Sequence, residues 1–424
     1  MSRTAEIRTL ARREPQSAIE KLRQLLAELF NFEVRNIRLN NDQYSLNSLN
    51  GTFDTADGSF FFKFHQEDGE EAMTGEYYRA DILAQAGLPV DQPLHVSAVP
   101  GEQILIYRKR DDLRFSDVLR HREFDTGISA SDVAIEAERD LCRRLLLVYQ
   151  QTLHPITGDQ AAAEPIHRLF YERMIDPVSR RFPGGRLADF YVDKTFDFPG
   201  LTVEWREFSR LKFVINGVPH AQSIGELFAA AGDRLQPTRL AGSGGVVAHG
   251  DAHTANVWYA MKTGKVELSF FDPAFAGAHV PTLLSEVKPT FHNIFAHPLW
   301  LYEPQEASTY LHAQARIKDG MLHIETDWQL TPMRAELLRV KAIELWRPLL
   351  RELKHRDLLP QDWQTVIRLG LFLSPTLVMN LRAGAATHSP LSSLIAFAVA
   401  VMVGSPPVGA TDAVADFFDL ISPD

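Results

Sequence analysis

Residues 249–256 read HGDAHTAN, and residues 270–273 read FFDP. The segment between them, 257–271, places aromatic and β-branched residues on either side of a glycine-containing turn. This pattern is typical of two antiparallel strands joined by a short connection. A hairpin here would bring Asp272 back beside Asn256, so the stretch predicts a cluster of polar side chains at one end of the hairpin.

The residue types in this cluster suit phosphoryl transfer. The transferred γ-phosphoryl group passes through a loose, highly charged transition state, so the protein mainly supplies position and countercharge. Asp251 is a candidate base for the proton of an acceptor hydroxyl. Asn256 and Asp272 are candidate Mg²⁺ ligands, because Mg²⁺ prefers oxygen and is usually held by one or two carboxylates together with substrate phosphates.

The two motifs also resemble those of the aminoglycoside phosphotransferase and choline kinase family, small-molecule kinases with a protein-kinase-like fold. HGDAHTAN is similar to that family's H-G-D-x-H-x-x-N catalytic loop, and FFDP to its metal-binding Asp after two hydrophobic residues. The resemblance implies that Asp251 is the catalytic base and that Asn256 and Asp272 hold the metal. It further implies ATP and Mg²⁺ as cofactors and a two-lobed α+β fold, with a small N-terminal antiparallel sheet lobe and a larger, mainly helical C-terminal lobe.

A transition-metal site is the alternative interpretation of the same loop. His249, Asp251 and His253 alternate along the chain, and imidazole with carboxylate suits zinc. A zinc site leaves Asn256 and Asp272 unexplained, however. We therefore expect His249 to brace the loop by hydrogen bonding and His253 to be structural as well.

A kinase needs a second half of the site on another lobe, and residues 59–65, SFFFKFH, can provide it. Lys63 interrupts an aromatic strand and would pair with the α- and β-phosphates. The alternative is a solvated lysine on an edge strand, where lysine is common. A helix is predicted at 69–87, ending at a glycine followed by proline. Glu76 lies on its apolar face and would hold Lys63, and the segment 75–90 resembles the family's glutamate helix with a G-x-P-V turn.

The nucleotide-covering loop is expected at residues 40–47, which contain no glycine. Ser45 could offer a hydroxyl where protein kinases use backbone amides. A strand at 94–99 and another at 103–107 would complete the small sheet. The hinge follows, and we assign Tyr107, Arg108 and Arg110 to the nucleotide side, with the run 108–110 expected to be solvated rather than bound to phosphate.

With 424 residues the chain exceeds a single core, so two lobes are expected, at 1–110 and 111–424. The first would begin with a helix starting near Pro15. Helical spacing of apolar residues predicts further helices in the second lobe at 129–153, 223–231, 333–353 and 394–403.

The net charge of −10, with acidic and basic residues interspersed, gives no basic stripe for nucleic acid. It favours cationic or neutral acceptors over polyanions. Cys142 is the single cysteine, so no intramolecular disulfide is possible and a reducing cytosol fits. Residues 1–13 lack the apolar core of a signal peptide, and the longest apolar run, 394–403, is too short to cross a membrane. A cytoplasmic protein is expected.

Acceptor specificity is expected to lie in the long connections 155–222 and 274–327. The first includes a hairpin signal at Asn216-Gly217, and the second includes Lys288, His292 and Tyr302. His279 stands where many relatives have an acidic residue, so the resemblance does not establish aminoglycoside or choline specificity. We expect His279 to be a structural or substrate-side residue.

The sequence thus predicts an ATP-dependent phosphotransferase acting on a hydroxyl of a small molecule, such as a sugar, an amino sugar or an aminoglycoside-like compound. Two alternatives stay open. One is a kinase directed at proteins, and the other is a non-catalytic nucleotide-binding regulatory module.

Overall fold

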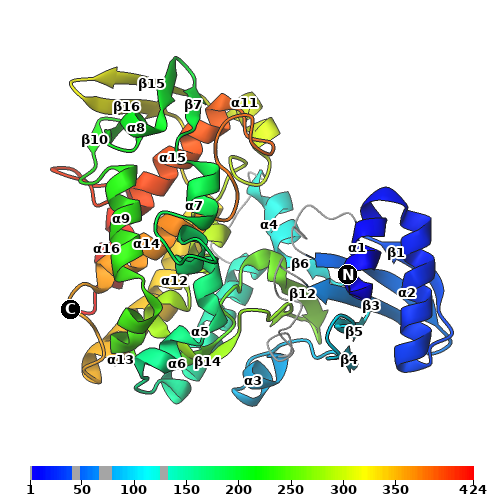
Figure 1. The fold of residues 1–424 in the computed structure, drawn as a ribbon. Helices are drawn as coiled ribbons and strands as arrows, with labels where there is room; N and C mark the ends of the chain where they lie inside the picture. Colours follow the sequence, from blue (N-terminus) through cyan, green and yellow to red (C-terminus); the bar gives the residue numbers. More distant parts are fainter. Residues whose placement is uncertain (1, 41–47, 66–78, 125–131) are drawn as a thin grey trace.

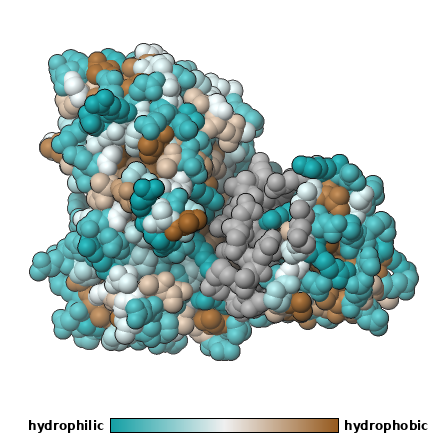
Figure 2. Space-filling view, viewed as in Figure 1, coloured by the Kyte–Doolittle hydropathy of each residue, from teal (hydrophilic) through white to brown (hydrophobic). Residues whose placement is uncertain are grey.

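The computed structural model describes residues 2–40, 48–65, 79–124 and 132–424. A small antiparallel sheet with two helices forms one end of the molecule, and a larger, mainly helical body forms the other (Figure 1). Two hydrophobic cores match this division, one in the small lobe and one in the larger body. The predicted two-lobed α+β architecture is therefore confirmed. Both lobes expose a mostly hydrophilic surface on the face seen in Figure 2.

The chain begins with two helices, α1 (Arg3–Arg13) and α2 (Pro15–Phe30). α2 starts at the predicted proline, which suits the first helical turn because its missing N–H has no partner there. It ends at Asn31, whose φ of 56° is the left-handed conformation common after a helix. The sequence analysis did not anticipate α1.

The small sheet has the order β1-β2-β3-β5-β4, with all neighbours antiparallel. Its strands are β1 (Arg35–Leu39), β2 (Ser48–Thr55), β3 (Gly58–His65), β4 (His95–Ser97) and β5 (Ile104–Arg108). β3 pairs with β2 on one side and β5 on the other. Lys63 consequently lies on a central strand, and the edge-strand interpretation of this lysine is wrong.

Alternation along β3 separates the core from the cleft. Phe60, Phe62 and Phe64 are buried in the small core, whereas Phe61 and Lys63 line the cleft described below. Successive side chains of a strand point to opposite faces. The aromatic run therefore anchors the sheet on α1 and α2 while it presents one lysine to the other face.

Only the end of the helix predicted at 69–87 falls within the described residues, as α3 (Ala80–Gln85). Gly87 follows with φ 93°, in agreement with the predicted stop. Leu83 and Leu88 are buried in the core of the larger body rather than in that of the small sheet. This part of the chain thus packs on the helical lobe.

The larger body contains the predicted helices with adjusted limits. Its longer helices are α4 (Phe115–Glu123), α5 (Val133–Thr152), α9 (Ile224–Arg234), α12 (Pro332–Lys341), α13 (Arg347–His355), α14 (Trp363–Thr376), α15 (Pro390–Gly404) and α16 (Ala413–Ile421). The single helix predicted at 333–353 is instead α12 and α13 joined by a π-helical turn, Ala342–Trp346. Pro348 explains the interruption, because it has no N–H to donate to the preceding turn.

Shorter helices connect these elements. They are α6 (Gly158–Ala162), α7 (Gly185–Phe190), α8 (Trp205–Phe208), α10 (Val287–Thr290) and α11 (Pro304–Tyr310). α15 is buried around most of its circumference, which accounts for its uniformly apolar sequence. None of the described helices is long and apolar enough to span a bilayer.

Four further sheets belong to the larger body. Their strands are β6 (Leu113–Arg114), β12 (Val257–Lys262) and β13 (Lys265–Phe270); β11 (Gly245–Ala248) and β14 (Gly277–Pro281); β7 (Thr195–Phe198) and β8 (Leu201–Glu204); and β9 (Lys212–Ile215), β10 (Val218–Pro219), β15 (Ala313–Lys318) and β16 (Met321–Thr326).

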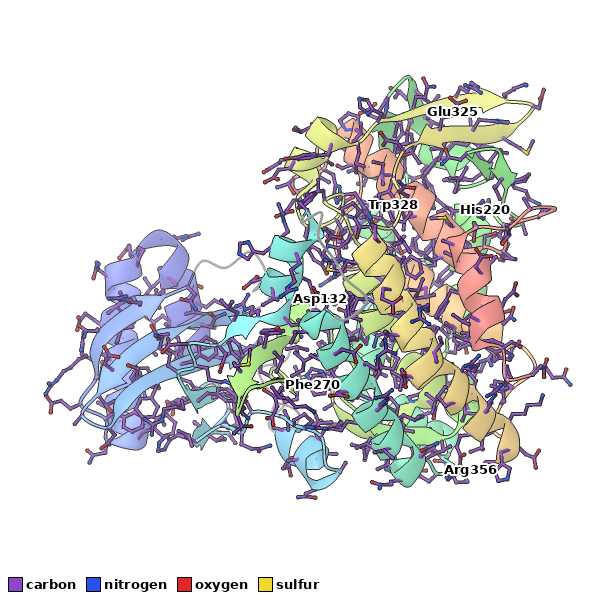
Figure 3. All side chains as sticks on the ribbon, turned by 180° about the vertical axis from the view of Figure 1, so that it is seen from behind. Asp132, His220, Phe270, Glu325, Trp328 and Arg356 are labelled. Carbon is purple, nitrogen blue, oxygen red and sulfur yellow. The ribbon has the colours of Figure 1, made fainter. Side chains whose placement is uncertain are left out.

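The sheet β10-β9-β16-β15 unites the two long connections. β9 lies within 155–222 and β16 within 274–327, and they pair in parallel. The predicted turn between β9 and β10 is present, with φ 49° at Asn216 and 84° at Gly217. This sheet lies at the top of the helical body in Figure 1, away from the small lobe, and Glu325 of β16 is labelled on it in Figure 3.

Candidate active site

The predicted hairpin joins the two motifs. β12 pairs with β13 in register from Val257 opposite Phe270, and the Phe271 amide donates to the Asn256 carbonyl over 3.0 Å. Phe270 lies where the small lobe meets the helical body (Figure 3), and its amide donates to the Pro89 carbonyl over 2.7 Å. Asp272 follows with φ 57°. The hairpin thus brings Asp272 beside the end of the HGDAHTAN loop, as expected.

His249 braces this loop through both of its ring nitrogens. Nε2 lies 3.0 Å from the Phe271 carbonyl oxygen, and Nδ1 accepts the Asp251 amide over 3.3 Å. The ring is buried, and this burial lowers the pKa of His249. A neutral ring with its proton on Nε2 satisfies both contacts, so His249 has no nitrogen left for a metal.

The zinc interpretation therefore loses one of its three ligands. No group of three His, Cys, Asp or Glu side chains with metal-binding geometry occurs within 2–40, 48–65, 79–124 and 132–424. The role expected for His249 from the sequence, bracing by hydrogen bonds, agrees with its contacts.

Gly250 permits the tight path between His249 and Asp251. Its φ is 77°, and a Cβ at this position would lie 2.5 Å from the Phe275 carbonyl oxygen. Only glycine adopts this conformation without strain at so close an approach.

The Asp251 carboxylate lines the cleft between the lobes. Its Oδ2 lies 3.8 Å from His253 Nε2, and its Oδ1 lies 4.0 Å from Lys288 Nζ. Oδ1 is buried and has no hydrogen-bond partner in the described part of the chain. A buried acceptor without a partner is costly, so this oxygen is suited to receive a hydroxyl proton from a bound molecule.

Asn256 is held by the loop that precedes it. Its Nδ2 donates to the Asp251 carbonyl over 2.9 Å and lies 3.4 Å from His253 Nε2. Those contacts occupy the amide nitrogen and leave Oδ1 as a possible ligand. Burial lowers the pKa of His253, so this ring is neutral at pH 7 and acts as an acceptor for the amide.

Lys63 reaches from the small lobe to the larger one. Its ammonium forms an ion pair with Asp272 Oδ2, and its side chain is largely buried. This contact joins β3 to the end of the β12–β13 hairpin. Glu76, the partner expected from the sequence, and Ser45, expected in the phosphate loop, lie outside the described residues.

The hinge residues Tyr107, Arg108 and Arg110 all line the cleft. Arg108 is exposed, donates to the Asp57 carbonyl over 2.8 Å and covers the Phe60 ring at 4.9 Å. Its exposure agrees with the solvated character expected for this run.

Arg110 differs from that expectation. Its guanidinium lies 2.6 Å from an Asp91 oxygen and 2.7 Å from an Asp112 oxygen, and only about 20% of the side chain is exposed. Asp91 also accepts the Trp258 indole N–H over 2.7 Å. Arg110 therefore links the hinge to β12 instead of extending into solvent.

His279 lies behind the site. It belongs to β14, its Nδ1 is 2.8 Å from His154 Nε2, and its amide donates to Glu164 Oε1 over 2.8 Å. It is not among the residues that line the cleft. The structure therefore gives His279 a structural setting and no contact with the cleft.

The cleft itself has a volume of about 960 Å³, within the range of small-molecule sites. Lys63, Asp251, Asn256 and Asp272 all line it. So do Arg173, Lys288, His292 and Tyr302, which lie in the two connections expected to carry acceptor specificity, and Met379, which lies outside them. No individual role was predicted for Arg173 or Met379, because they reach the cleft from distant segments.

No family model and no curated protein matches this chain. Among solved structures, it is similar to a spectinomycin phosphotransferase in complex with ADP and spectinomycin, with 13% identity over 90% of this chain and 98% of that chain and a TM-score of 0.36. It is also similar to an aminoglycoside phosphotransferase of Streptomyces rimosus, with 17% identity, 80% and 97% coverage and a TM-score of 0.35. It is similar as well to an ethanolamine kinase of Plasmodium vivax, with 11% identity over 94% of this chain and 94% of that chain and a TM-score of 0.38.

These are the kinds of enzyme that the two motifs resemble.

Proposed function

We propose that this protein is an ATP-dependent phosphotransferase that moves the γ-phosphoryl group of ATP to a hydroxyl of a small molecule. The observation that carries the proposal is the meeting of four side chains at one cleft. Asp251, Asn256 and Asp272 come from a single loop and hairpin of the larger lobe, and Lys63 comes from the central strand of the small sheet.

In this proposal Asp251 is the general base. Its unpartnered Oδ1 accepts the proton of the acceptor hydroxyl, whose oxygen forms a bond to the γ-phosphorus. The bond between that phosphorus and the β–γ bridging oxygen breaks, and ADP leaves. A positioned general base contributes roughly 10²–10⁴ in rate.

The oxygen donors fit Mg²⁺. Asp272 offers a carboxylate, and Asn256 offers the amide oxygen that its own hydrogen bonds leave over. When bound there, Mg²⁺ neutralises the phosphate charge that develops during transfer. Lys63 is held in the cleft by Asp272, and we assign it to the α- and β-phosphates, with Asp272 retaining it until nucleotide enters.

We further propose that the two lobes have different roles and that the boundary between them is the hinge. Residues 1–110 form the nucleotide-binding lobe, with Tyr107, Arg108 and Arg110 on the adenine side. Residues 111–424 form the catalytic and acceptor-binding lobe. The two separate hydrophobic cores support this division, except that Leu83 and Leu88 pack in the core of the larger body.

The test is Mg²⁺-dependent consumption of ATP in the presence of pooled hydroxyl compounds, with the wild type compared to Asp251→Asn. Stimulation by a pool, lost in Asp251→Asn while binding of Mg–ATP persists, is the expected result. Asp319→Asn is the matched control, because Asp319 is exposed in the turn between β15 and β16 and does not line the cleft. Equal stimulation in wild type and Asp251→Asn would contradict the proposal.

A further inference from the structure

Lys288 is a buried lysine close to Asp251, and the proposed transfer reaction assigns it no role. Lys288 belongs to α10, is 2% exposed and lines the cleft. Its Nζ lies 3.0 Å from His292 Nε2 and 4.0 Å from Asp251 Oδ1. The second distance is too long for a hydrogen bond. In the described part of the chain the ammonium makes one hydrogen bond, although it has three N–H donors.

The hydrogen bonds around Lys288 fix the direction of that donor. His292 Nε2 faces the lysine, and His292 Nδ1 lies 2.5 Å from the Tyr302 hydroxyl. Burial lowers the pKa of His292 well below its usual value, so the ring is neutral. A neutral ring that accepts from Lys288 at Nε2 carries its proton on Nδ1. His292 and Tyr302 thus orient the Lys288 ammonium without neutralising its charge.

A second cation shares this part of the cleft. Arg173 lies in a 3₁₀ turn, Tyr171–Met174, is 9% exposed and lines the same cleft. Burial lowers the pKa of Lys288 to about 8, with Asp251 opposing this and the charges of Arg173 and Arg186 adding to it. Arg186 donates to the carbonyls of Leu377 and Val378 at 3.0 and 3.1 Å. Lys288 and Arg173 are therefore two buried cations in the lining that also contains Asp251.

The carboxylates on this side are already paired with another arginine. Glu303 accepts from Arg120 Nε at 2.8 and 2.7 Å, and Glu306 lies 3.6 Å from the same guanidinium. A cationic acceptor needs carboxylates for its ammonium groups, because a buried charge without a partner is costly. Of the three carboxylates that line this side, Asp251 is required as the base, and Glu303 and Glu306 share the single guanidinium of Arg120.

The cations of the lining divide between the two sides of the cleft. Among described residues, seven Lys and Arg side chains and five Asp and Glu side chains line the cleft, although the whole chain carries −10. Five of the cations, namely Lys63, Arg108, Lys109, Arg110 and Arg114, belong to the small lobe and the segment that follows it, on the side assigned to the nucleotide. Lys288 and Arg173 are the two cations of the acceptor side, so the local attraction for an anion there depends on these two buried groups.

From this arrangement we infer that the acceptor is a small hydroxylated anion, whose carboxylate or phosphate binds at Lys288 and Arg173 while its hydroxyl faces Asp251. The inference rests on the proposed phosphotransferase function and names the acceptor class for the same site. Lys288 and Arg173 neutralise the charge of the bound anion, and the Asp251 carboxylate remains available to accept the hydroxyl proton.

The test uses acceptors that differ in charge on a shared skeleton. Gluconate and glucose 6-phosphate are the anionic members, glucose is neutral and glucosamine is cationic. Each heads a pool of its class: hydroxy acids, sugar phosphates, neutral sugars, and amino sugars with amino alcohols. ATP consumption with Mg²⁺ is measured for every pool, and the two anionic pools distinguish carboxylate from phosphate. Stimulation confined to an anionic pool is the expected result.

Two variants test the role of Lys288. Lys288→Met is expected to raise the KM for the anionic acceptor at least about tenfold, the effect of losing one charge-assisted hydrogen bond, with the KM for ATP little changed. Lys288→Arg should restore part of the loss. Lys318→Met, on the exposed strand β15, is the matched control. Thermal unfolding checks that each variant folds, and the wild-type acceptor preference stands as the test if one does not.

Three outcomes separate the claims. Stimulation by the neutral or amino pools and not by the anionic ones would overturn the inference while leaving the phosphotransferase intact. A fall in kcat for Lys288→Met, with the acceptor KM unchanged, would also overturn it, since Lys288 would then serve the transferred phosphate. If no pool is phosphorylated and no ATP hydrolysis depends on Asp251, the proposed function fails, and the inference falls with it.

Discussion

The two sides of the cleft differ in how their charged side chains are paired. On the nucleotide side, cations are paired within the protein: Lys63 with Asp272, and Arg110 with Asp91 and Asp112. On the acceptor side, Asp251 and Lys288 lie 4.0 Å apart without a direct hydrogen bond. Internal ion pairs hold the cations of the nucleotide side, whereas the acceptor side keeps oriented charges that a bound molecule can satisfy. Preorganised groups of this kind bind or react with little rearrangement.

The largest effect is expected from Asp251→Asn, which removes the base but keeps the shape of the side chain. We expect turnover to fall by about 10²–10⁴, while the dissociation constant of Mg–ATP stays near that of the wild type. Steady-state kinetics with isothermal titration of a non-hydrolysable nucleotide would measure both. Near-normal turnover would show that the acceptor side does not act as proposed.

Lys288→Met tests whether the acceptor side holds an unneutralised charge. Burial lowers the pKa of Lys288 in the folded protein to about 8, against 10.5 for an ordinary lysine. Between these values the unfolded chain binds more protons, so the stability of the wild type rises with pH. The free-energy cost of burying the charged ammonium is fully present below pH 8 and is relieved above pH 10.5. Lys288→Met should lack this rise, a difference on the order of 3 kcal/mol.

Chemical unfolding of both proteins at pH 7.5 and 10 measures that difference, with Lys318→Met as the control. Protonated Lys288 is also the form that binds an anion, so the acceptor KM should increase above pH 8. If the unfolding free energies of wild type and Lys288→Met changed in parallel with pH, Lys288 would not be a buried charge that lowers stability.

Lys63→Met and Asp272→Asn test the pairing on the nucleotide side. Because Asp272 is partly exposed, we expect a coupling free energy of about 2 kcal/mol between the two changes in the nucleotide-free protein. A double-mutant cycle by denaturant unfolding gives this value. Additive effects would show that the ion pair contributes little and that the contrast between the two sides is weaker than described.

The smallest effect is expected from His279→Phe. His279 hydrogen-bonds His154 behind the catalytic loop and does not line the cleft. Loss of this contact should lower the unfolding free energy by about 1 kcal/mol and leave acceptor-dependent turnover close to wild type. A large loss of turnover with normal stability would place His279 in the working site after all.

Local patterns predicted the parts of the site that are close in sequence. The hairpin follows from alternating residues around a tight turn, and it fixes Asp272 beside Asn256. The alternation in residues 59–65 separates three core phenylalanines from Lys63. The Asn216-Gly217 turn has the positive φ angles that this dipeptide signals. In each case the physical cause acts within a few residues.

The sequence placed the acceptor side in two long connections, but the residues that meet there could not be predicted, because distant contacts bring them together. Arg173 comes from a 3₁₀ turn and Lys288 from a four-residue helix, and neither element has a strong periodic pattern. The parallel pairing of β9 with β16 joins two connections that the sequence left separate. The pairing of Arg110 with Asp91 likewise depends on how the lobes meet, so its sequence resembled that of a solvated run.

The most direct test of the central claim is the transfer of γ-labelled phosphate from ATP to acceptors of the four charge classes, by wild type and Asp251→Asn. We predict labelled product from an anionic class with the wild type and none with the variant. Labelled product at an undiminished rate with Asp251→Asn, or no labelled product from any class with the wild type, would contradict the account.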